Sequence, residues 1–158
     1  MYRLITYNLH SGVGRDGIQD YARIGRFLVE QDADFVLLQE MDTRSAGRDV
    51  NDDISAICAD GKYMLIPAPT VTTQHGWYGN AILTRHPVLH RQQFDISVSG
   101  REPRTLQHVV VTPDKQPLNL LNAHLGLKKK ERAYQARRLH EIMQSINERN
   151  QMPACLGG

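Results

Sequence analysis

Two polar side chains follow short apolar runs of the sequence and could act together on a metal ion. Asn8 closes the run at residues 2–8, and Glu40 comes shortly after the run at residues 35–38. If both runs are parallel strands joined by a helix, the two side chains emerge at the same carboxyl-end edge of a sheet. A carboxylate beside a carboxamide suits Mg²⁺, which takes one or two protein carboxylates together with water and substrate phosphate. We therefore predict a metal site at Glu40 and Asn8.

A histidine stands at a similar position later in the chain. His124 ends the apolar segment 120–125 and could donate a hydrogen bond to a phosphoryl oxygen as that oxygen gains charge. Each of the three residues also has an ordinary explanation. Glu40 alone is an exposed acid, Asn8 alone begins a turn, and His124 alone is a half-buried ring satisfied by backbone.

The composition is that of an ordinary globular domain. The chain has 158 residues, of which 41% are hydrophobic and 23% are charged. These values exclude collagen-like, low-complexity and strongly disordered classes. No apolar run is long enough for a membrane span, and the first residues lack the pattern of a secretory signal. Two cysteines, Cys58 and Cys155, cannot form a disulfide framework, so a reducing cytoplasm is the expected location.

Charge is distributed unevenly along the chain. Residues 1–79 contain seven Lys and Arg against eleven Asp and Glu, whereas residues 80–158 contain twelve against six. The net charges of these parts are therefore −4 and +6. An acidic part suits a cation and a basic part suits phosphate, which favours a metal-assisted phosphate site. The alternative is that both charge blocks are only solvated faces.

The hydrophobic pattern predicts one layered domain with both strands and helices. Strands are predicted at residues 2–8, 35–38, 63–66, 78–84, 105–111 and 118–123, helices at 21–28, 50–59 and 131–149, and the beginning of a further strand at 152–158. Asp20 is expected to cap the first helix. Pro67, Pro69 and Gly76 predict a loop between the third and fourth strands. This order favours an α+β fold or layered sandwich.

Four short motifs, taken in order, resemble the endonuclease/exonuclease/phosphatase superfamily. The motifs are Tyr7-Asn8-Leu9-His10, Leu38-Gln39-Glu40-Met41-Asp42, Tyr78-Gly79-Asn80-Ala81-Ile82-Leu83 and Asn122-Ala123-His124-Leu125. The resemblance spans residues 2–158. That superfamily includes pancreatic deoxyribonuclease, apurinic-site endonucleases, sphingomyelinases and inositol-polyphosphate phosphatases.

The resemblance implies a role for each matching residue. Glu40 corresponds to the main Mg²⁺ carboxylate, with Mn²⁺ as the other candidate metal, and Asn8 helps to arrange metal and phosphate. His124 corresponds to the residue that contacts the scissile phosphate. The expected catalytic residues are thus Asn8, Glu40 and His124, and the metal residues are Glu40 and Asn8. The expected substrate-binding residues are His10, Asn80, Arg101 and Arg104.

Two of these residues come from a segment that is similar to one branch of the family. Arg101-Glu102-Pro103-Arg104 resembles the Arg-Glu-Pro segment of the deoxyribonucleases. Some nucleases carry an arginine two residues after the metal glutamate, but Asp42 stands there in this chain. The resemblance therefore leaves the substrate class open.

The fold implied by the resemblance is a DNase I-like four-layer α/β sandwich of two sheets with helices outside. Residues 1–158 are expected to form a single incomplete domain, the N-terminal portion, with one sheet and its covering helices. The family's Asp-Phe-Asn and Asp-His elements, which activate water and complete the acid–base chemistry, would follow Gly158. An uncovered apolar sheet face would then remain, and we expect a homodimer to cover it.

The expected function is that of a Mg²⁺-dependent phosphohydrolase of phosphodiesterase or nuclease type, with a phosphate ester as substrate and nucleic acid among the candidates. Because part of the active site is missing, activity of residues 1–158 should be weak or nil. One alternative is a lipid or sugar phosphate hydrolase with the same chemistry. Another is a non-catalytic binding or interaction module that retains the metal-site residues as scaffold.

Overall fold

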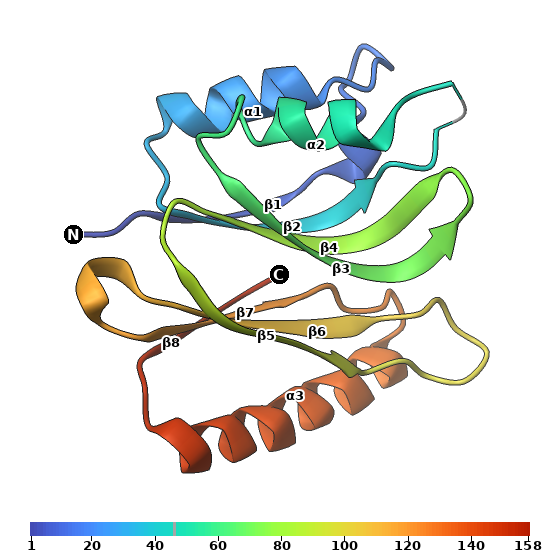
Figure 1. Ribbon diagram of the computed structural model, residues 1–158. Coiled ribbons are helices and arrows are strands. Elements are labelled where there is room, and N and C mark those ends of the chain that lie inside the picture. Colours follow the sequence, from blue (N-terminus) through green and yellow to red (C-terminus); the bar gives the residue numbers. More distant parts are fainter. Residues whose placement is uncertain (46) are drawn as a thin grey trace.

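Two four-stranded sheets lie face to face between helices in the computed structural model (Figure 1). The structure describes residues 1–45 and 47–158. The sheets have the strand orders β1-β2-β4-β3 and β5-β6-β7-β8. The strands are β1 (Leu4–Asn8), β2 (Phe35–Asp42), β3 (Met64–Thr73), β4 (Gly76–Thr84), β5 (Val88–Asp95), β6 (Thr105–Val111), β7 (Leu118–Ala123) and β8 (Ala154–Gly157); the helices are α1 (Tyr21–Glu30), α2 (Val50–Ile57) and α3 (Lys129–Asn150).

The first sheet begins with the predicted parallel pair of strands. Strands β1 and β2 run parallel, with Asn8 opposite Gln39, so their carboxyl ends meet at one edge. Helix α1 connects them and begins as predicted, since the Asp20 side chain accepts a hydrogen bond of 2.8 Å from the Arg23 backbone N–H. Helices α1 and α2 cover the outer face of this sheet (Figure 1).

The second sheet contains the predicted strands β6 and β7, which pair in antiparallel orientation, and helix α3 covers its outer face (Figure 1). Leu139, Ile142 and Ile146 of α3 pack against Leu106 and Leu121 of the sheet. The predicted final strand is also present, because β8 pairs in parallel with β7. His124, which follows β7, is therefore held on a strand that is paired on both sides.

The expectation of one sheet with a bare inner face is wrong. Phe35 and Leu37 of β2 are almost fully buried against Val109 of β6 and Leu120 of β7, so the inner faces of two sheets cover each other. The apolar runs at 35–38 and 118–121 belong to different sheets, so each sheet has an apolar face that the other covers. This correction removes the reason for a homodimer formed through that face.

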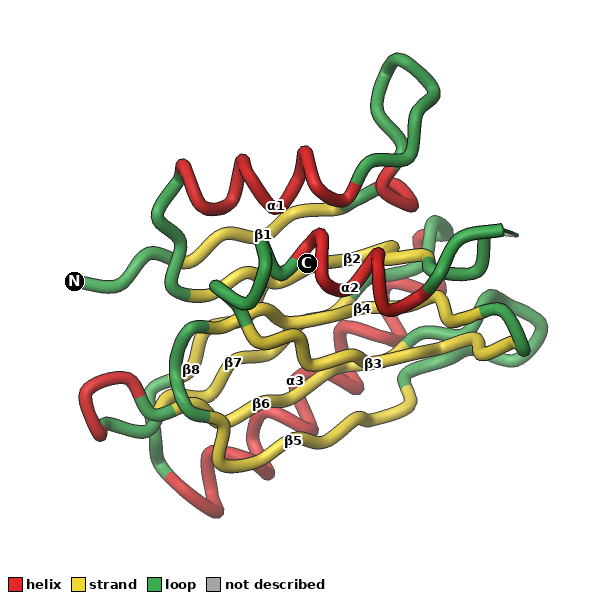
Figure 2. The backbone as a smooth tube through the Cα atoms, turned by 45° about the horizontal axis from the view of Figure 1, so that its top comes forward, coloured by secondary structure: helices red, strands yellow, loops and turns green. Residues whose placement is uncertain are grey.

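The sequence pattern was least informative along one side of the sandwich. Strand β3 continues through Pro67 and Pro69, where a loop was expected, and β5 was not predicted at all. Both strands are sheet edges, and Figure 2 shows them on the same side of the molecule. Proline is tolerated on an edge strand because no second neighbour needs its N–H. Exposed residues such as His90 and Gln92 give β5 no apolar signal.

Within the described part of the chain, no helix combines the length and the apolar character that a membrane crossing requires.

Candidate active site

Glu40 contacts three polar side chains at the edge where the strand ends meet. The Asn8 side-chain nitrogen Nδ2 lies 3.0 Å from the Glu40 oxygen Oε1, and the His124 nitrogen Nε2 lies 3.2 Å from the same oxygen. His10 approaches the other oxygen, with Nδ1 3.7 Å from Oε2. The structure thus brings Asn8, His10, Glu40 and His124 together from β1, β2 and the segment after β7.

The backbone of Glu40 has an unusual conformation that directs its side chain. Its φ is 56°, in the left-handed region, and it lies at a register shift between Leu38 and Met41 of β2. A β-bulge of this kind re-aims a side chain relative to the regular alternation of a strand. A left-handed residue other than glycine costs about 1–3 kcal/mol, and such strain clusters at functional sites.

Asn8 is oriented by the backbone that follows it. Its oxygen Oδ1 accepts a 2.9 Å hydrogen bond from the His10 backbone N–H, so its nitrogen Nδ2 is the atom that faces Glu40. The amide therefore donates to the carboxylate and fixes its direction. This arrangement suits a positioning role for Asn8 better than a role as a direct metal ligand.

The donor set is compatible with a divalent cation held mainly by Glu40. Magnesium needs only one or two protein carboxylates, because water and substrate phosphate complete its coordination. The Glu40 side chain is 22% exposed, so part of the carboxylate remains accessible. Among the residues that the structure describes, no group of three or more His, Cys, Asp or Glu side chains is arranged to hold a metal ion.

The environment of His124 favours its neutral form. Burial lowers the pKa of the ring below its usual value of 6.5, and the positive charge of Arg104 lowers it further. The carboxylates of Glu40 and Glu102 act in the opposite direction but are smaller effects. A neutral imidazole still carries one N–H, so His124 keeps one hydrogen bond that it can donate to a ligand.

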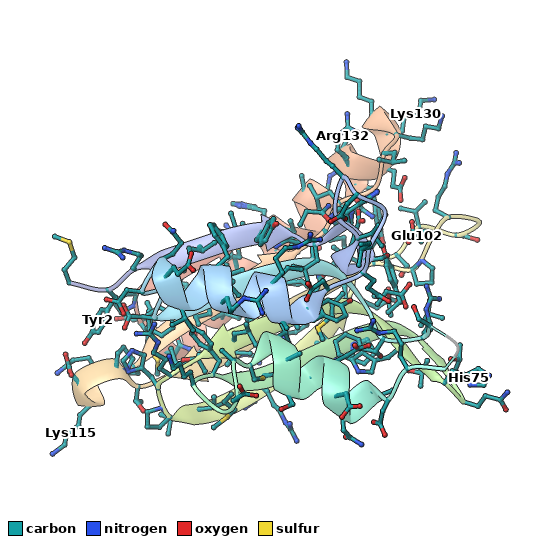
Figure 3. All side chains as sticks on the ribbon, turned by 90° about the horizontal axis from the view of Figure 1, so that it is seen from above. Tyr2, His75, Glu102, Lys115, Lys130 and Arg132 are labelled. Atoms are coloured by element: carbon teal, nitrogen blue, oxygen red, sulfur yellow. The ribbon has the colours of Figure 1, made fainter. Side chains whose placement is uncertain are left out.

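Arg104 places a buried cation beside this group. The residue is only 7% exposed, and its Nη2 lies 2.8 Å from the Glu102 oxygen Oε2. Its Nε is buried and has no hydrogen-bond partner among the described residues. A buried N–H without a partner is costly, so this atom is a candidate donor to an anionic ligand. Figure 3 shows Glu102 at the same end of the molecule as Arg132 and Lys130.

A small cavity joins these groups. Its free volume is about 10 Å³, and the residues that line it are Glu40, Thr70, Tyr78, Gly79, Asn80, Arg104, Thr105 and His124. That volume is close to the space that one water molecule needs. The cavity therefore accommodates one water or ion between the two sheets.

The two remaining predicted residues are placed differently. Asn80 lines the cavity, is 4% exposed, and donates from Nδ2 to the Thr105 backbone oxygen at 3.3 Å, which links the sheets. Arg101 is exposed in the loop before β6 and is not one of the residues around the cavity. The structure thus groups Arg104 and Asn80 with the site and leaves Arg101 outside it.

Sequence reasoning missed the buried amides beneath the site. Gln39 donates from Nε2 to the Asn122 oxygen Oδ1 at 2.8 Å, and Asn122 donates from Nδ2 to the backbone oxygens of Leu38 and Ala81 at 2.8 and 3.0 Å. These bonds connect the residue before Glu40 with the strand that leads to His124. The signal was present, since an amide inside an apolar run needs a buried partner.

A second arginine also reaches this edge. Asp42 stands where some nucleases carry arginine, and its carboxylate binds Nε and Nη2 of Arg44, both at 2.8 Å. The Arg44 guanidinium lies 5.0 Å from the ring centre of Tyr78, which lines the cavity. A guanidinium is therefore present near the site, but it belongs to Arg44, two residues after Asp42.

This fold and this arrangement of side chains define a known class of protein. A family model described as "Endonuclease/Exonuclease/phosphatase family" matches residues 5–148, and the chain belongs to that family. The Escherichia coli (strain K12) protein named "Uncharacterized protein YbhP" is 34% identical over 73 residues, which are 45% of this chain and 29% of that protein.

Solved structures share the fold at low sequence identity. A mannosyl-6-phosphatase from Bacteroides thetaiotaomicron superposes with a TM-score of 0.81 at 18% identity, over 99% of this chain and 64% of that one. Humanized D. rerio TDP2 gives 0.68 at 19% identity, over 93% of this chain and 56% of that one. The chain thus spans less than two thirds of each of these relatives.

Proposed function

We propose that the chain is part of a divalent-metal-dependent phosphoric ester hydrolase of the phosphodiesterase or nuclease type. The observation that carries this proposal is the contact of Glu40 with Asn8 and His124 at the edge of the family fold. In this proposal, residues 1–158 are a portion of one endonuclease/exonuclease/phosphatase domain. Family membership supports a hydrolase of phosphate esters, and the geometry supports the assignment of Asn8, Glu40 and His124 as the catalytic residues.

In this proposal, some residues at the site bind the cation and others bind the phosphate. Glu40 would hold Mg²⁺ or Mn²⁺, and Asn8 would keep its carboxylate turned toward the cavity. Such a cation, when bound, neutralises charge on the phosphoryl oxygens. His124 and Arg104 would donate hydrogen bonds from their N–H groups to phosphate oxygens. These hydrogen bonds strengthen as the oxygens gain negative charge. Asn80 lines the same cavity, and His10 lies beside the other oxygen of Glu40.

We expect little turnover from residues 1–158 alone. Asn8, His10 and His124 surround Glu40. The Asp-Phe-Asn and Asp-His elements, to which the family resemblance assigns the activation of water, are not found in residues 1–158. Removing one member of a cooperating catalytic set costs nearly as much as removing the set. Hydrolysis of bis(4-nitrophenyl) phosphate in Mg²⁺ should therefore stay near the rate in buffer. Robust turnover that disappears in Glu40→Ala would contradict this expectation while retaining the site.

Metal binding tests the site without relying on turnover. Substoichiometric Mn²⁺ added to ¹⁵N-labelled protein should broaden the amide signals of Asn8, Glu40 and His124, and excess Mg²⁺ should restore them. The Glu40→Gln variant should lose this broadening, whereas Glu148→Gln, which changes an exposed acid near the end of α3, should keep it. Equal broadening in both variants would contradict the proposed metal site.

A cytoplasmic location is also part of the proposal. Its support is that Cys58 and Cys155 are both free thiols in the structure.

A further inference from the structure

A groove extends from the candidate active site along the side of the sandwich. A cavity of about 370 Å³ shares Thr70, Arg104 and Thr105 with the small cavity at Glu40. A further cavity of about 390 Å³ shares Pro69 and Gln93 with the second one. Together the two larger cavities form one hollow between edge strands β3 and β5, which we call the β3–β5 groove. Figure 2 shows these two strands on the same side of the molecule.

Hydrogen bonds between the sheets give the groove a fixed floor. Gln107 of β6 donates from Nε2 to the backbone oxygen of Ile66 in β3 at 2.7 Å. Nearer the active site, Asn80 of β4 donates to the backbone oxygen of Thr105 in β6. Because both side chains are almost fully buried, the two rims are held at a fixed separation.

The part of the groove next to the active site carries several hydrogen-bonding side chains beside Pro69 and Pro103. Thr70, Gln93, Asp95 and Ser97 all line the cavity next to the site. Asp95 accepts from the Ser97 backbone N–H at 2.8 Å, and the Ser97 side chain together with this N–H lowers the pKa of its carboxyl group. An ionised carboxylate beside a carboxamide and hydroxyls can bind neighbouring hydroxyl groups of a ligand. The carboxylate accepts hydrogen bonds from those hydroxyls, and the amide can both donate and accept them.

Two other occupants fit the groove less well. A nucleic acid strand calls for a track of Lys and Arg. The residues that line the groove include two arginines, Arg91 and Arg104, one in each cavity, and the carboxylate of Asp95 lies in the same cavity as Arg104. A peptide added as a strand would need the N–H groups of an edge strand. Pro67 and Pro69 remove two of them from β3.

Arg104 connects the groove with the phosphate end of the site. It lines both the small cavity and the first part of the groove, and its buried Nε has no partner among the described residues. A ligand with an anionic group at Arg104 would therefore place the rest of its structure between Thr70 and Asp95. We propose that the β3–β5 groove binds the polyhydroxyl part of a sugar phosphate whose phosphate group lies at Arg104 and His124. This inference rests on the part of the proposed function that assigns phosphoric ester hydrolysis to this site, and it names a sugar phosphate monoester as the substrate in place of a diester.

Chemical-shift mapping separates the two parts of this inference. In Mg²⁺, inorganic phosphate should shift the signals of His124 and Arg104 only. Glucose 6-phosphate should shift these signals and also those of Thr70, Gln93 and Ser97, with an affinity at least about ten-fold higher, as expected for two or three added hydrogen bonds. A tetranucleotide of thymidylate is the comparison ligand.

Two groove variants and a control sharpen the result. Gln93→Ala and Asp95→Ala should each weaken glucose 6-phosphate binding by about 5- to 20-fold and change phosphate binding by less than about two-fold. Gln144→Ala, at an exposed position of α3, should change neither. All three positions are exposed, so folding should be retained.

Each outcome decides the inference. If phosphate binds at His124 and Arg104 but the sugar adds neither affinity nor groove shifts, the inference fails and the proposed function stands. A tetranucleotide that shifts the groove signals more strongly than glucose 6-phosphate also overturns it. If phosphate does not affect His124 and Arg104, the proposed phosphate site fails, and this inference fails with it.

Discussion

The two sheets of the sandwich differ in charge and in what each gives to the candidate active site. The acidic part, residues 1–79, carries a net charge of −4, and residues 80–84, which finish β4, are uncharged. The charge boundary therefore coincides with the boundary between the sheets. The first sheet supplies Glu40, and the basic part with the second sheet supplies His124 and Arg104.

This difference shows that cation and anion recognition come from separate layers. The carboxylate that would hold the metal lies on the acidic layer, while the groups that would hold phosphate follow β7 or precede β6 in the basic one. The site exists only where the layers meet, so the contacts that join them are as important as the side chains themselves. Three predictions test this view, from the largest expected effect to the smallest.

Breaking the connection between the layers should have the largest effect. Asn122→Ala leaves the backbone oxygens of Leu38 and Ala81 and the Gln39 amide without their partner in a fully buried place. We expect the free energy of unfolding to fall by about 3–5 kcal/mol, measured by urea denaturation. Asn51→Ala, at an exposed position of α2, should change it by less than about 0.5 kcal/mol. A loss below about 1 kcal/mol for Asn122→Ala would show that the layers do not depend on this network.

Altering the cation of the basic layer should have an intermediate effect. Arg104→Lys keeps the charge but removes Nε and the planar guanidinium, so phosphate affinity should fall about ten-fold. Titration with inorganic phosphate in Mg²⁺, followed by NMR, measures the change. Arg149→Lys, on the exposed face of α3, is the matched control and should leave the affinity unchanged. Equal affinities in both variants would exclude Arg104 from the anion side.

The smallest effect is a pKa change transmitted between the layers. The negative charge of Glu40 raises the pKa of His124 against the larger effect of burial, so Glu40→Gln should lower that pKa further. Because the folded pKa lies below the unfolded value near 6.5, His124 contributes full stability above that pH and loses it as the pH falls toward the folded value. In the Glu40→Gln variant, this loss of stability should continue to a lower pH. Titration of the histidine ring signals measures the shift, and a rise in the pKa would contradict the assigned contact.

The sequence allowed prediction of the elements whose burial leaves a clear pattern. The apolar run at 35–38 and the period of Leu139, Ile142 and Ile146 identified a covered strand and a covered helix correctly. Strand β5 was missed because an edge strand with one solvated face needs no apolar run. The division into two sheets was missed for a different reason, since an apolar strand records that it is buried but not which sheet it joins.

The proximity of Asn8, Glu40 and His124 could be predicted from the sequence, but their detailed geometry could not. Strand order placed Asn8, Glu40 and His124 at strand ends, and the structure shows them in contact. The left-handed backbone at Glu40 could not be predicted, because glutamate gives no local signal for that conformation. The direction of the Asn8 amide depends on the His10 backbone, which only coordinates reveal.

The left-handed backbone at Glu40 affects how the stability and the metal affinity of this protein can be changed by mutation. Glycine relaxes a left-handed backbone, so a library selected only for resistance to heat should accumulate Glu40→Gly. A library selected for manganese retention should keep the glutamate and find its thermal gains elsewhere. Thermal stability and metal affinity therefore favour different residues at position 40.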